Sequence, residues 1–358
     1  MSLLDDRLAP PDLTPEVLID PAGTARDGAA LPEVDVLREL YRRMTIGRRF
    51  DAQATALTKQ GRLAVYPSSR GQEACEVAAV LALAEGDWLF PTYRDSVAIV
   101  TRSVDPVDTL SLLRGDRHCG YDPYEHRVAP QCTPLATNTL HAVGLAHAAR
   151  VKGQDTAVLV LLGDGATSEG DTHEALNFAS VWKAPVVFLV QNNGFAISVP
   201  LAKQTAAPSF AHKAVGYGMP GRLIDGNDAA QVYSTVQAAL DTARRGGGPT
   251  LIEGVTYRIE AHTNADDATR YRSSDEVRTW LARDPLARLE TYLRSAGALD
   301  NASAAAVAEE AERFAEQVRT RMNADVRPST DDLFDHVYAT PTAALERQRA
   351  GLAEELSR

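Results

Sequence analysis

The chain has 358 residues, of which 44% are hydrophobic and 24% charged, and this composition is that of an ordinary globular protein. Its formal net charge is −11 and it contains no run of basic residues, which argues against a nucleic-acid-binding surface because phosphate backbones require basic patches. The three cysteines have no C-x-x-C spacing, which favours free thiols in a reducing compartment. No apolar stretch reaches the roughly 18 residues of a membrane span, and the start of the chain carries no visible secretory signal. These features predict a cytoplasmic protein that binds neither nucleic acid nor membrane.

The first part of the chain predicts an arm followed by two helices. Residues 1–32 are rich in Pro, Asp and Gly, which is typical of an extended arm that wraps a partner or is loose. Apolar residues recur at helical spacing over residues 37–59 and again over 73–84, and residues 88–90 predict a short strand. Residues 114–134 have little periodicity and predict a long loop with a functional role.

The middle of the chain alternates between apolar strands and helices. Strands are expected at residues 156–162, 186–191, 222–225 and 250–255, and helices at residues 138–151, 172–182, 208–216 and 229–245. Such alternation predicts an α/β fold with a mostly parallel sheet and helices on both of its faces. We assign residues 33–275 to this domain, whose last part, residues 258–274, is a polar loop.

The C-terminal part, residues 276–358, predicts a helical region that packs on the same domain and on partner chains. Helices are expected at residues 276–283, 285–295, 303–322 and 340–356. In the last of these, Thr340 suits the N-cap and Pro341 the first helical position.

Two polar motifs follow the predicted buried strands directly. Gly163-Asp164-Gly165 comes after the second strand, and Asn192-Asn193-Gly194 comes after the third. In parallel α/β sheets, ligands usually bind beyond the carboxyl ends of the strands. Asp164 offers a carboxylate and Asn193 an amide oxygen, both hard ligands for Mg²⁺, and the glycines allow close approach of a phosphate. A simple turn would explain the first motif alone, but the pair predicts a metal–diphosphate site, the signature of thiamin-diphosphate enzymes.

Together with their surroundings, these motifs resemble those of the α subunits of 2-oxo acid dehydrogenase E1 components. The resemblance spans residues 35–356, and the motifs that carry it are Gly71–Ala74, Tyr93–Asp95, Thr133–Thr137, Gly163–Asp171, Glu174–Ala179, Gln191–Ser198, Asp225–Asp228, Tyr257-Arg258, His262, Asp266-Asp267 and Arg270–Ser273. Residues 59–69, 121–126 and 261–267 are most similar to bacterial branched-chain 2-oxo acid dehydrogenases. Pyruvate and acetoin dehydrogenase α subunits share the core motif and remain alternatives.

The resemblance implies the thiamin-diphosphate-binding fold, with thiamin diphosphate and Mg²⁺ as cofactors. Asp164, Asn193 and the backbone carbonyl of Phe195 are the implied Mg²⁺ ligands. The residues implied to contact the cofactor are Tyr93, Arg94, Thr133, Leu135, Gly163, Asp164, Gly165, Ala166, Asn193, Phe195, Ala196, Ile197 and His262. Arg94 suits this role because its planar guanidinium donates two parallel hydrogen bonds to phosphate oxygens.

Relatives also imply two further sites. The acyl group of the substrate is expected beside Val65, Tyr93 and Leu135, and Leu135 would also support the thiazolium ring from below. A structural K⁺ is a hypothesis for the main chain and side chains around Cys132, Thr137 and Asn138.

His262 is the implied catalytic residue of this chain. It lies in the polar loop after the last strand, and an imidazole that titrates near neutral pH can bind an intermediate or the lipoyl group and transfer a proton. A histidine in a loop is most often a solvated surface residue, and only the matched motif favours catalysis here. We expect an ion pair between Asp267 and Arg270 to order the loop. Thr263 replaces the serine that is phosphorylated in mammalian relatives, which predicts that such control is absent.

Two features depart from the family pattern. Gln191 stands where some relatives have an arginine near the diphosphate, which would weaken that contact slightly. His118, Cys119 and His126 lie close in sequence, but structural zinc typically needs four ligands. We therefore interpret these three as loop residues at an interface.

The chain is expected to act only with a partner. The glutamate that activates the pyrimidine ring of the cofactor comes, in this family, from a separate domain, and this chain has no second α/β unit to supply it. The resemblance therefore implies an α2β2 heterotetramer with an E1 β subunit, docked on a lipoyl-bearing E2 acyltransferase. The implied reaction is oxidative decarboxylation of a branched-chain 2-oxo acid and transfer of its acyl group to the lipoyl group of E2.

Two other classes of protein fit the sequence less well. A non-catalytic paralogue would keep the fold without binding the cofactor, but Asp164, Asn193 and His262 are all present. A nucleotide-dependent enzyme would need G-x-G-x-x-G after a strand, or G-x-x-x-x-G-K-[ST], and the sequence has neither.

Overall fold

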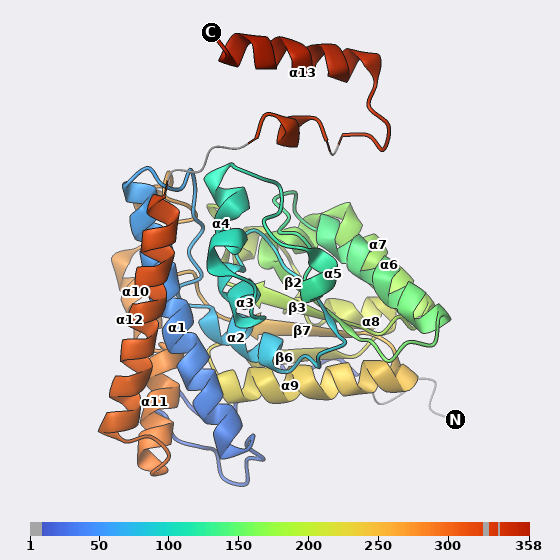
Figure 1. Ribbon diagram of the computed structural model, residues 1–358. Helices are drawn as coiled ribbons and strands as arrows, with labels where there is room; N and C mark the ends of the chain where they lie inside the picture. Colours follow the sequence, from blue (N-terminus) through green and yellow to red (C-terminus); the bar gives the residue numbers. More distant parts are fainter. Residues whose placement is uncertain (1–8, 325–328, 336) are drawn as a thin grey trace.

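A five-stranded sheet forms the centre of the molecule (Figure 1). The computed structural model describes residues 9–324, 329–335 and 337–358. In spatial order the strands are β1 (Trp88–Phe90), β2 (Val158–Gly163), β3 (Val186–Asn192), β7 (Thr250–Val255) and β6 (Gly221–Asp225). Every neighbouring pair is parallel, so the predicted α/β fold with a parallel sheet is confirmed. A small antiparallel pair, β4 (Phe195–Ala196) and β5 (Val199–Pro200), follows β3.

The central strands are buried because both of their faces carry apolar side chains. Along β2, Leu159 and Leu161 belong to the hydrophobic cluster on one face of the sheet. Val158, Val160 and Leu162 belong to the cluster on the other face, and all five side chains are 0% exposed. The alternation of side chains along a strand produces this division. Burial of one such side chain stabilises the fold by about 1.5–3 kcal/mol, so both faces must be covered by helices.

Each face has its own set of covering helices (Figure 1). The helices that contribute to the first cluster are α1 (Val34–Lys59), α2 (Glu73–Leu81), α3 (Ser96–Thr101), α4 (Pro106–Arg114), α9 (Ala229–Thr242), α11 (Pro285–Ser295) and α12 (Asn301–Asn323). Those that contribute to the second are α6 (Thr137–Val151), α7 (Gly170–Val181) and α8 (Lys213–Tyr217). Among the described residues, no helix combines the length and the apolar character that crossing a membrane requires.

Three helices in the first half of the chain, α3, α4 and the single turn α5 (Pro123–His126), were not expected from the sequence pattern. Asp105 caps α4 by accepting hydrogen bonds from the backbone N–H groups of Val107 (2.8 Å) and Asp108 (3.3 Å). The turn α5 interrupts the predicted loop 114–134 and begins in the same way, at an Asp-Pro pair. Asp at the N-cap and Pro in the first turn are start signals, and they identify helices that are too short for periodicity to reveal.

The C-terminal region contains α10 (Ser274–Leu281) and α13 (Ala343–Leu356) in addition to α11 and α12. Thr342 is the N-cap of α13, because its Oγ1 accepts from the backbone N–H of Leu345 at 3.3 Å. The predicted N-cap at Thr340 and helical start at Pro341 are therefore wrong, since only the Thr342 hydroxyl reaches the first turn. Residues 325–328 and 336 of this region lie outside the described residues. Figure 1 shows α13 apart from the sheet and its covering helices.

Part of the predicted arm lies along the edge of its own chain's sheet. Glu16 forms a parallel bridge with Ile224 of β6. The backbone N–H of Ile19 donates to the buried carboxylate of Asp228 at 2.7 Å, and the side chain of Ile19 is 1% exposed. These contacts protect an edge strand, so this part of the arm is not loose. Residues 1–8 of the arm lie outside the described residues.

Candidate functional site

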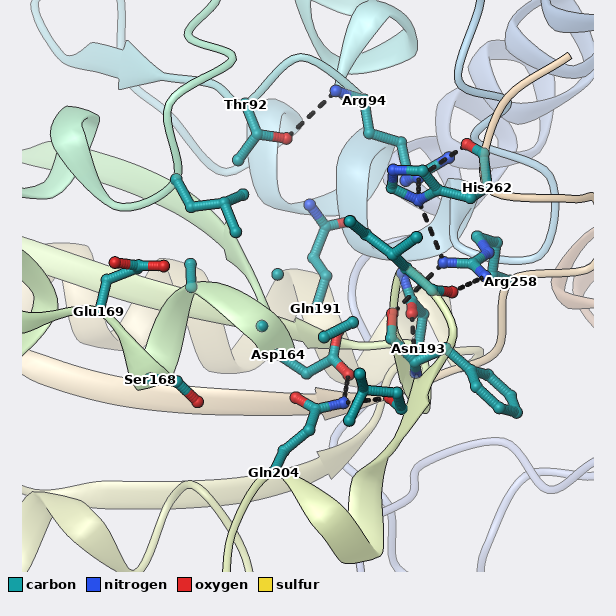
Figure 2. A pocket seen from close by; sticks show the side chains of 18 of the residues that line it. Thr92, Arg94, Asp164, Ser168, Glu169, Gln191, Asn193, Gln204, Arg258 and His262 are labelled. Carbon is teal, nitrogen blue, oxygen red and sulfur yellow. Dashed lines mark hydrogen bonds between the residues drawn. The ribbon is translucent and has the colours of Figure 1, made fainter. Parts of the chain in front are cut away.

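A cavity of about 330 Å³ opens at the carboxyl edge of the sheet. It is lined by segments that follow β1, β2, β3 and β7 in the sequence. Because parallel strands end at the same edge, residues that are far apart in sequence meet there. Figure 2 shows the side chains that line this cavity.

Most of the residues predicted to bind the cofactor line this cavity. They are Tyr93, Arg94, Leu135, Gly163, Asp164, Gly165, Ala166, Asn193, Phe195, Ala196, Ile197 and His262. Thr133 and Val65 are not among the lining residues; Thr133 is exposed and Val65 is half-buried. The structure therefore brings Asp164 and Asn193 into one cavity, and it leaves Thr133 and Val65 outside.

Asp164 is a buried carboxylate at the bottom of the cavity. It comes directly after β2, begins a short 3-10 helix (Asp164–Ser168) and is 2% exposed. Gln204 Nε2 donates to its Oδ2 at 2.6 Å, and no cationic side chain among the described residues forms an ion pair with it. Burial raises the pKa of Asp164, and the hydrogen bond from Gln204 opposes that rise. A buried carboxylate without a cation is unfavourable, so a bound metal ion would stabilise this end of the cavity.

A chain of buried amides holds Asn193, which follows β3. Asn193 Nδ2 donates to Gln72 Oε1 (3.2 Å), and Gln72 Nε2 donates to Gln191 Oε1 (3.0 Å). Gln191 Nε2 in turn donates to Asp95 Oδ1 at 2.7 Å. Because a carboxylate accepts and cannot donate, Asp95 sets the direction of every amide in the chain. Asn193 Oδ1 is thereby directed away from Gln72, and it accepts only a 3.3 Å bond from the backbone N–H of Phe195.

The sequence did not predict that Gln72 and Gln191 take part in the hydrogen bonds that orient Asn193. Gln191 was treated as the loss of a phosphate contact, and the structure makes it a neutral link between Gln72 and Asp95. Gln72 belongs to a matched motif, but nothing in the local pattern indicates its partner. Gln72 and Gln191 lie 119 positions apart, and a contact over that separation leaves no periodic pattern in the sequence.

The backbone around the cavity is tightly packed and locally strained. A Cβ atom at Gly165 would lie 2.8 Å from Ala196 Cβ, so only glycine permits this approach of the two motifs. Ile197 has a φ of 56°, which is rare for a β-branched residue, and its side chain is 56% exposed. Arg258 Nη2 donates to the carbonyl of Ile197 at 2.6 Å and helps to hold this conformation. Strain of this kind is concentrated at functional sites.

Two buried arginines meet at His262 on another side of the cavity (Figure 2). Arg94 is 5% exposed and Arg258 is 1% exposed. Arg94 Nη1 donates to the carbonyl of Ser68 at 2.9 Å, and Arg258 Nη1 donates to the carbonyl of Phe195 at 3.3 Å. Neither guanidinium forms an ion pair with a carboxylate in the part of the chain that the structure describes. Two buried cations without an anion make this side of the cavity suited to binding one.

His262 is held as a neutral imidazole. Its Nδ1 lies 3.1 Å from Arg94 Nη2 and 3.3 Å from Arg258 Nη1, and both of these atoms are donors. Nδ1 therefore accepts, and the ring proton is on Nε2. Burial, Arg94 and Arg258 lower the pKa of His262 to about 4. The prediction that this imidazole titrates near neutral pH is thus wrong for the cofactor-free chain, because two fixed cations oppose its protonation.

The loop that carries His262 is ordered by Asp266. The Oδ2 atom of Asp266 accepts from the backbone N–H of His262 at 2.8 Å and from the hydroxyl of Tyr271. Asp267 accepts from the backbone N–H of Thr269 at 3.1 Å, rather than forming the predicted ion pair with Arg270. The expected ordering of the loop is present, but the neighbouring carboxylate provides it.

Asp51 of α1 anchors the segment behind Arg94. Its carboxylate accepts from Tyr66 Oη (2.9 Å), Ser68 Oγ (2.7 Å) and the backbone N–H of Ser69 (2.8 Å). Arg94 Nη1 then donates to the carbonyl of Ser68 at 2.9 Å, and Ser69 Oγ donates to the backbone carbonyl of Arg94 at 2.9 Å. Burial raises the pKa of Asp51 to about 6. Asp51 was not identified from the sequence, because its position in a helix does not distinguish it from an exposed aspartate.

The chain belongs to the dehydrogenase E1 component family, whose model matches residues 41–333. It is 45% identical over 351 residues to the 3-methyl-2-oxobutanoate dehydrogenase subunit alpha of Mycobacterium tuberculosis, which covers 97% of this chain and 95% of that protein. It is 35% identical over 319 residues to the 2-oxoisovalerate dehydrogenase subunit alpha of Bacillus subtilis, with 86% and 93% covered. It is 38% identical over 284 residues to a pyruvate dehydrogenase E1 component subunit alpha of Staphylococcus aureus, with 78% and 76% covered.

These matches confirm the predicted resemblance to the α subunits of 2-oxo acid dehydrogenase E1 components. The family implies the use of thiamin diphosphate, and it implies a β-subunit partner and an E2 complex in general.

Proposed function

We propose that this chain is the α subunit of an E1 enzyme that oxidatively decarboxylates branched-chain 2-oxo acids and transfers the acyl group to the lipoyl group of E2. The observation that carries the proposal is the meeting of Asp164 and Asn193 with Arg94 and His262 in one cavity at the carboxyl edge of the sheet. The names of the M. tuberculosis and B. subtilis relatives denote the same branched substrate, which supports the choice of substrate class. The S. aureus relative keeps pyruvate as the second candidate.

The residues present fit a metal-bound diphosphate. Asp164, Asn193 Oδ1 and the carbonyl of Phe195 would hold Mg²⁺, which prefers oxygen ligands of this kind. Phe195 accepts a bond from Arg258 at 3.3 Å, and its carbonyl oxygen has a second lone pair for the metal. Arg94, buried and without a carboxylate partner, would donate to the phosphate oxygens. A structural K⁺ near Cys132, Thr137 and Asn138 stays a prediction.

When bound, thiamin diphosphate supplies the carbon that attacks the 2-oxo group and the ring that accepts the electron pair released with CO₂. The chain's own residues position and shield this chemistry. His262, with its proton on Nε2 and two arginines behind Nδ1, would donate a hydrogen bond to the reacting group. An anion bound by Arg94 and Arg258 would offset their charge and raise the pKa of His262. His262 could then accept and donate a proton at neutral pH.

The acyl pocket is proposed beside Tyr93 and Leu135, which line the cavity, whereas Val65 lies outside it. Leu135 is 37% exposed and Ile197 is 56% exposed, so the mouth of the cavity is partly apolar in the isolated chain. These features suit a site completed by an E1 β subunit, in an α2β2 heterotetramer that delivers acyl groups to E2. A cytoplasmic location accords with this role.

The proposal is tested by assembling the chain with its β subunit and comparing turnover of 3-methyl-2-oxobutanoate, pyruvate and acetoin. We expect the highest kcat/KM for 3-methyl-2-oxobutanoate, and almost no turnover by the α chain alone. Preference for pyruvate or acetoin would overturn the substrate class. Absence of thiamin-diphosphate binding by the assembly in calorimetry, with Mg²⁺ present, would make the chain a non-catalytic paralogue.

A further inference from the structure

Gln204 contacts the carboxylate of Asp164 but matches no motif of the sequence. It follows β5 and a short 3-10 helix (Leu201–Lys203), and it lines the cavity from below (Figure 2). Its Nε2 donates to Asp164 Oδ2 at 2.6 Å and to the carbonyl of Val199 at 3.0 Å. The second bond joins the amide to the backbone of β5, so Gln204 is held on both sides of its nitrogen.

The other end of the same amide has no partner among the described residues. Gln204 Oε1 is buried and accepts no hydrogen bond from residues 9–324, 329–335 or 337–358. Buried polar atoms nearly always have a partner, and each exception needs an explanation. The nitrogen is fixed by two acceptors, so rotation of the amide would lose both bonds without satisfying the oxygen. An additional donor that enters the cavity would satisfy it.

The geometry points to a positioning role in the metal site. We propose that Gln204 holds Asp164 through Nε2, which leaves Asp164 Oδ1 for the metal ion, and that Gln204 Oε1 accepts a hydrogen bond from a water bound to that ion. Mg²⁺ dehydrates reluctantly and usually keeps several waters, so such a donor accompanies it. This inference rests on the proposed thiamin-diphosphate function and adds a residue to its metal site.

The neutrality of Gln204 is part of the inference. A lysine or arginine in its place would form an ion pair with Asp164 and compete with the metal for its charge. A glutamate would lack the N–H donor and would place a second negative charge beside Asp164. An amide has the required donor and acceptor without either charge. Groups of this kind orient the residues that bind a metal, and their loss typically weakens metal binding by about 10–100-fold.

The test uses the heterotetramer with its β subunit and measures metal binding without relying on turnover. Mn²⁺ replaces Mg²⁺, and free Mn²⁺ is counted by electron paramagnetic resonance at saturating thiamin diphosphate. We expect Gln204→Ala to weaken Mn²⁺ binding by about 10–100-fold. The matched control is Gln237→Ala, because Gln237 is an exposed residue of α9 whose amide donates to the hydroxyl of Tyr233 on the same helix, and its loss should leave binding unchanged.

The outcomes separate this inference from the function on which it rests. Wild-type affinity in Gln204→Ala would overturn the role of Gln204 while leaving the proposed function intact. Failure of the wild-type assembly to bind Mn²⁺ with thiamin diphosphate would overturn both. If Gln204→Ala does not assemble, Gln204→Asn replaces it, because its shorter amide cannot reach both Val199 and Asp164. Wild-type binding by that variant also contradicts the inference.

Discussion

The two ends of the cavity are built from opposite kinds of polar group. One end offers the carboxylate of Asp164 and the amide oxygen of Asn193. The other offers the guanidinium groups of Arg94 and Arg258, with the neutral His262 between them (Figure 2). A cavity lined by one sign of charge attracts any ion of the other sign. A cavity that is acidic at one end and basic at the other favours a ligand that carries a cation and an anion together, as a metal diphosphate does.

The two ends also differ in how the fold positions them. Asp164 and Asn193 each follow a buried strand directly, so adjacent parallel strands bring them together. Arg94 is held by Ser68 and by His262, which lies 168 positions further along the chain. The ends of two paired strands therefore place Asp164 and Asn193 side by side, whereas the basic end is brought together by hydrogen bonds between loops that are distant in sequence. Four substitutions or measurements test this distinction.

Asp164→Ala should have the largest effect, because it removes the buried carboxylate at the acidic end. We expect metal-dependent binding of thiamin diphosphate to weaken by more than about 100-fold, since a direct ligand should matter more than outer groups worth about 10–100-fold. Isothermal titration calorimetry on the heterotetramer, with and without Mg²⁺, measures this loss. Glu174→Gln on the exposed side of α7 is the control. Unchanged binding of thiamin diphosphate in Asp164→Ala would show that the acidic end does not contribute to the cofactor site.

Arg94→Lys should weaken binding of the diphosphate by about 10–100-fold, because hydrogen bonds to charged groups contribute about 1.5–3 kcal/mol. Lysine keeps the charge but loses the planar fork that donates two bonds. The loss should persist at saturating Mg²⁺, which distinguishes it from the effect of Asp164→Ala. The exposed Arg278→Lys on α10 should bind normally. If the loss of diphosphate binding disappears as the Mg²⁺ concentration is raised, the two ends of the cavity do not contribute independently to binding.

Asp51→Ala should act on stability more than on chemistry. It leaves the backbone N–H of Ser69 without an acceptor, and such a group costs about 1–3 kcal/mol when buried. Urea unfolding of the cofactor-free assembly measures this change. Because Arg94 depends on the same segment, cofactor affinity should fall, though less than in Arg94→Lys. Asp51→Asn keeps one acceptor oxygen, so it should lose less stability than Asp51→Ala. An equal loss of stability in both variants would show that the charge of Asp51 matters more than its hydrogen bonds.

The smallest effect is expected from protonation of His262, which changes the stability of the folded chain. Its folded pKa of about 4 lies below the ordinary value of 6.5, so the folded state resists protonation. By linkage, its contribution to stability is fully present above about pH 6.5 and is lost as pH falls towards 4. Imidazole ¹⁵N chemical shifts of the cofactor-free assembly should show a neutral ring above pH 5. Arg258→Gln should raise this pKa, and a midpoint near 6.5 in the wild-type chain would contradict the arrangement.

The sequence predicted most of the sheet and the acidic end of the cavity. Each strand is a short apolar run, and Asp164 and Asn193 follow two of these runs, so local pattern and the geometry of parallel sheets were sufficient. The resemblance to the family extended this to Arg94 and His262. Val65 and Thr133 are not among the residues that line the cavity of the isolated chain, so their roles stay predictions.

What the sequence by itself determined is the fold class, the order of elements and the carboxylate and amide at the strand ends, because each depends on residues within a few positions. Only the tertiary structure decided the roles of Gln72, Gln191 and Gln204, and the neutral state of His262. The amide partners lie as many as 121 positions apart, and the pKa of His262 reflects two cations from different loops. Such contacts depend on where folded segments meet, which no local spacing of residues encodes.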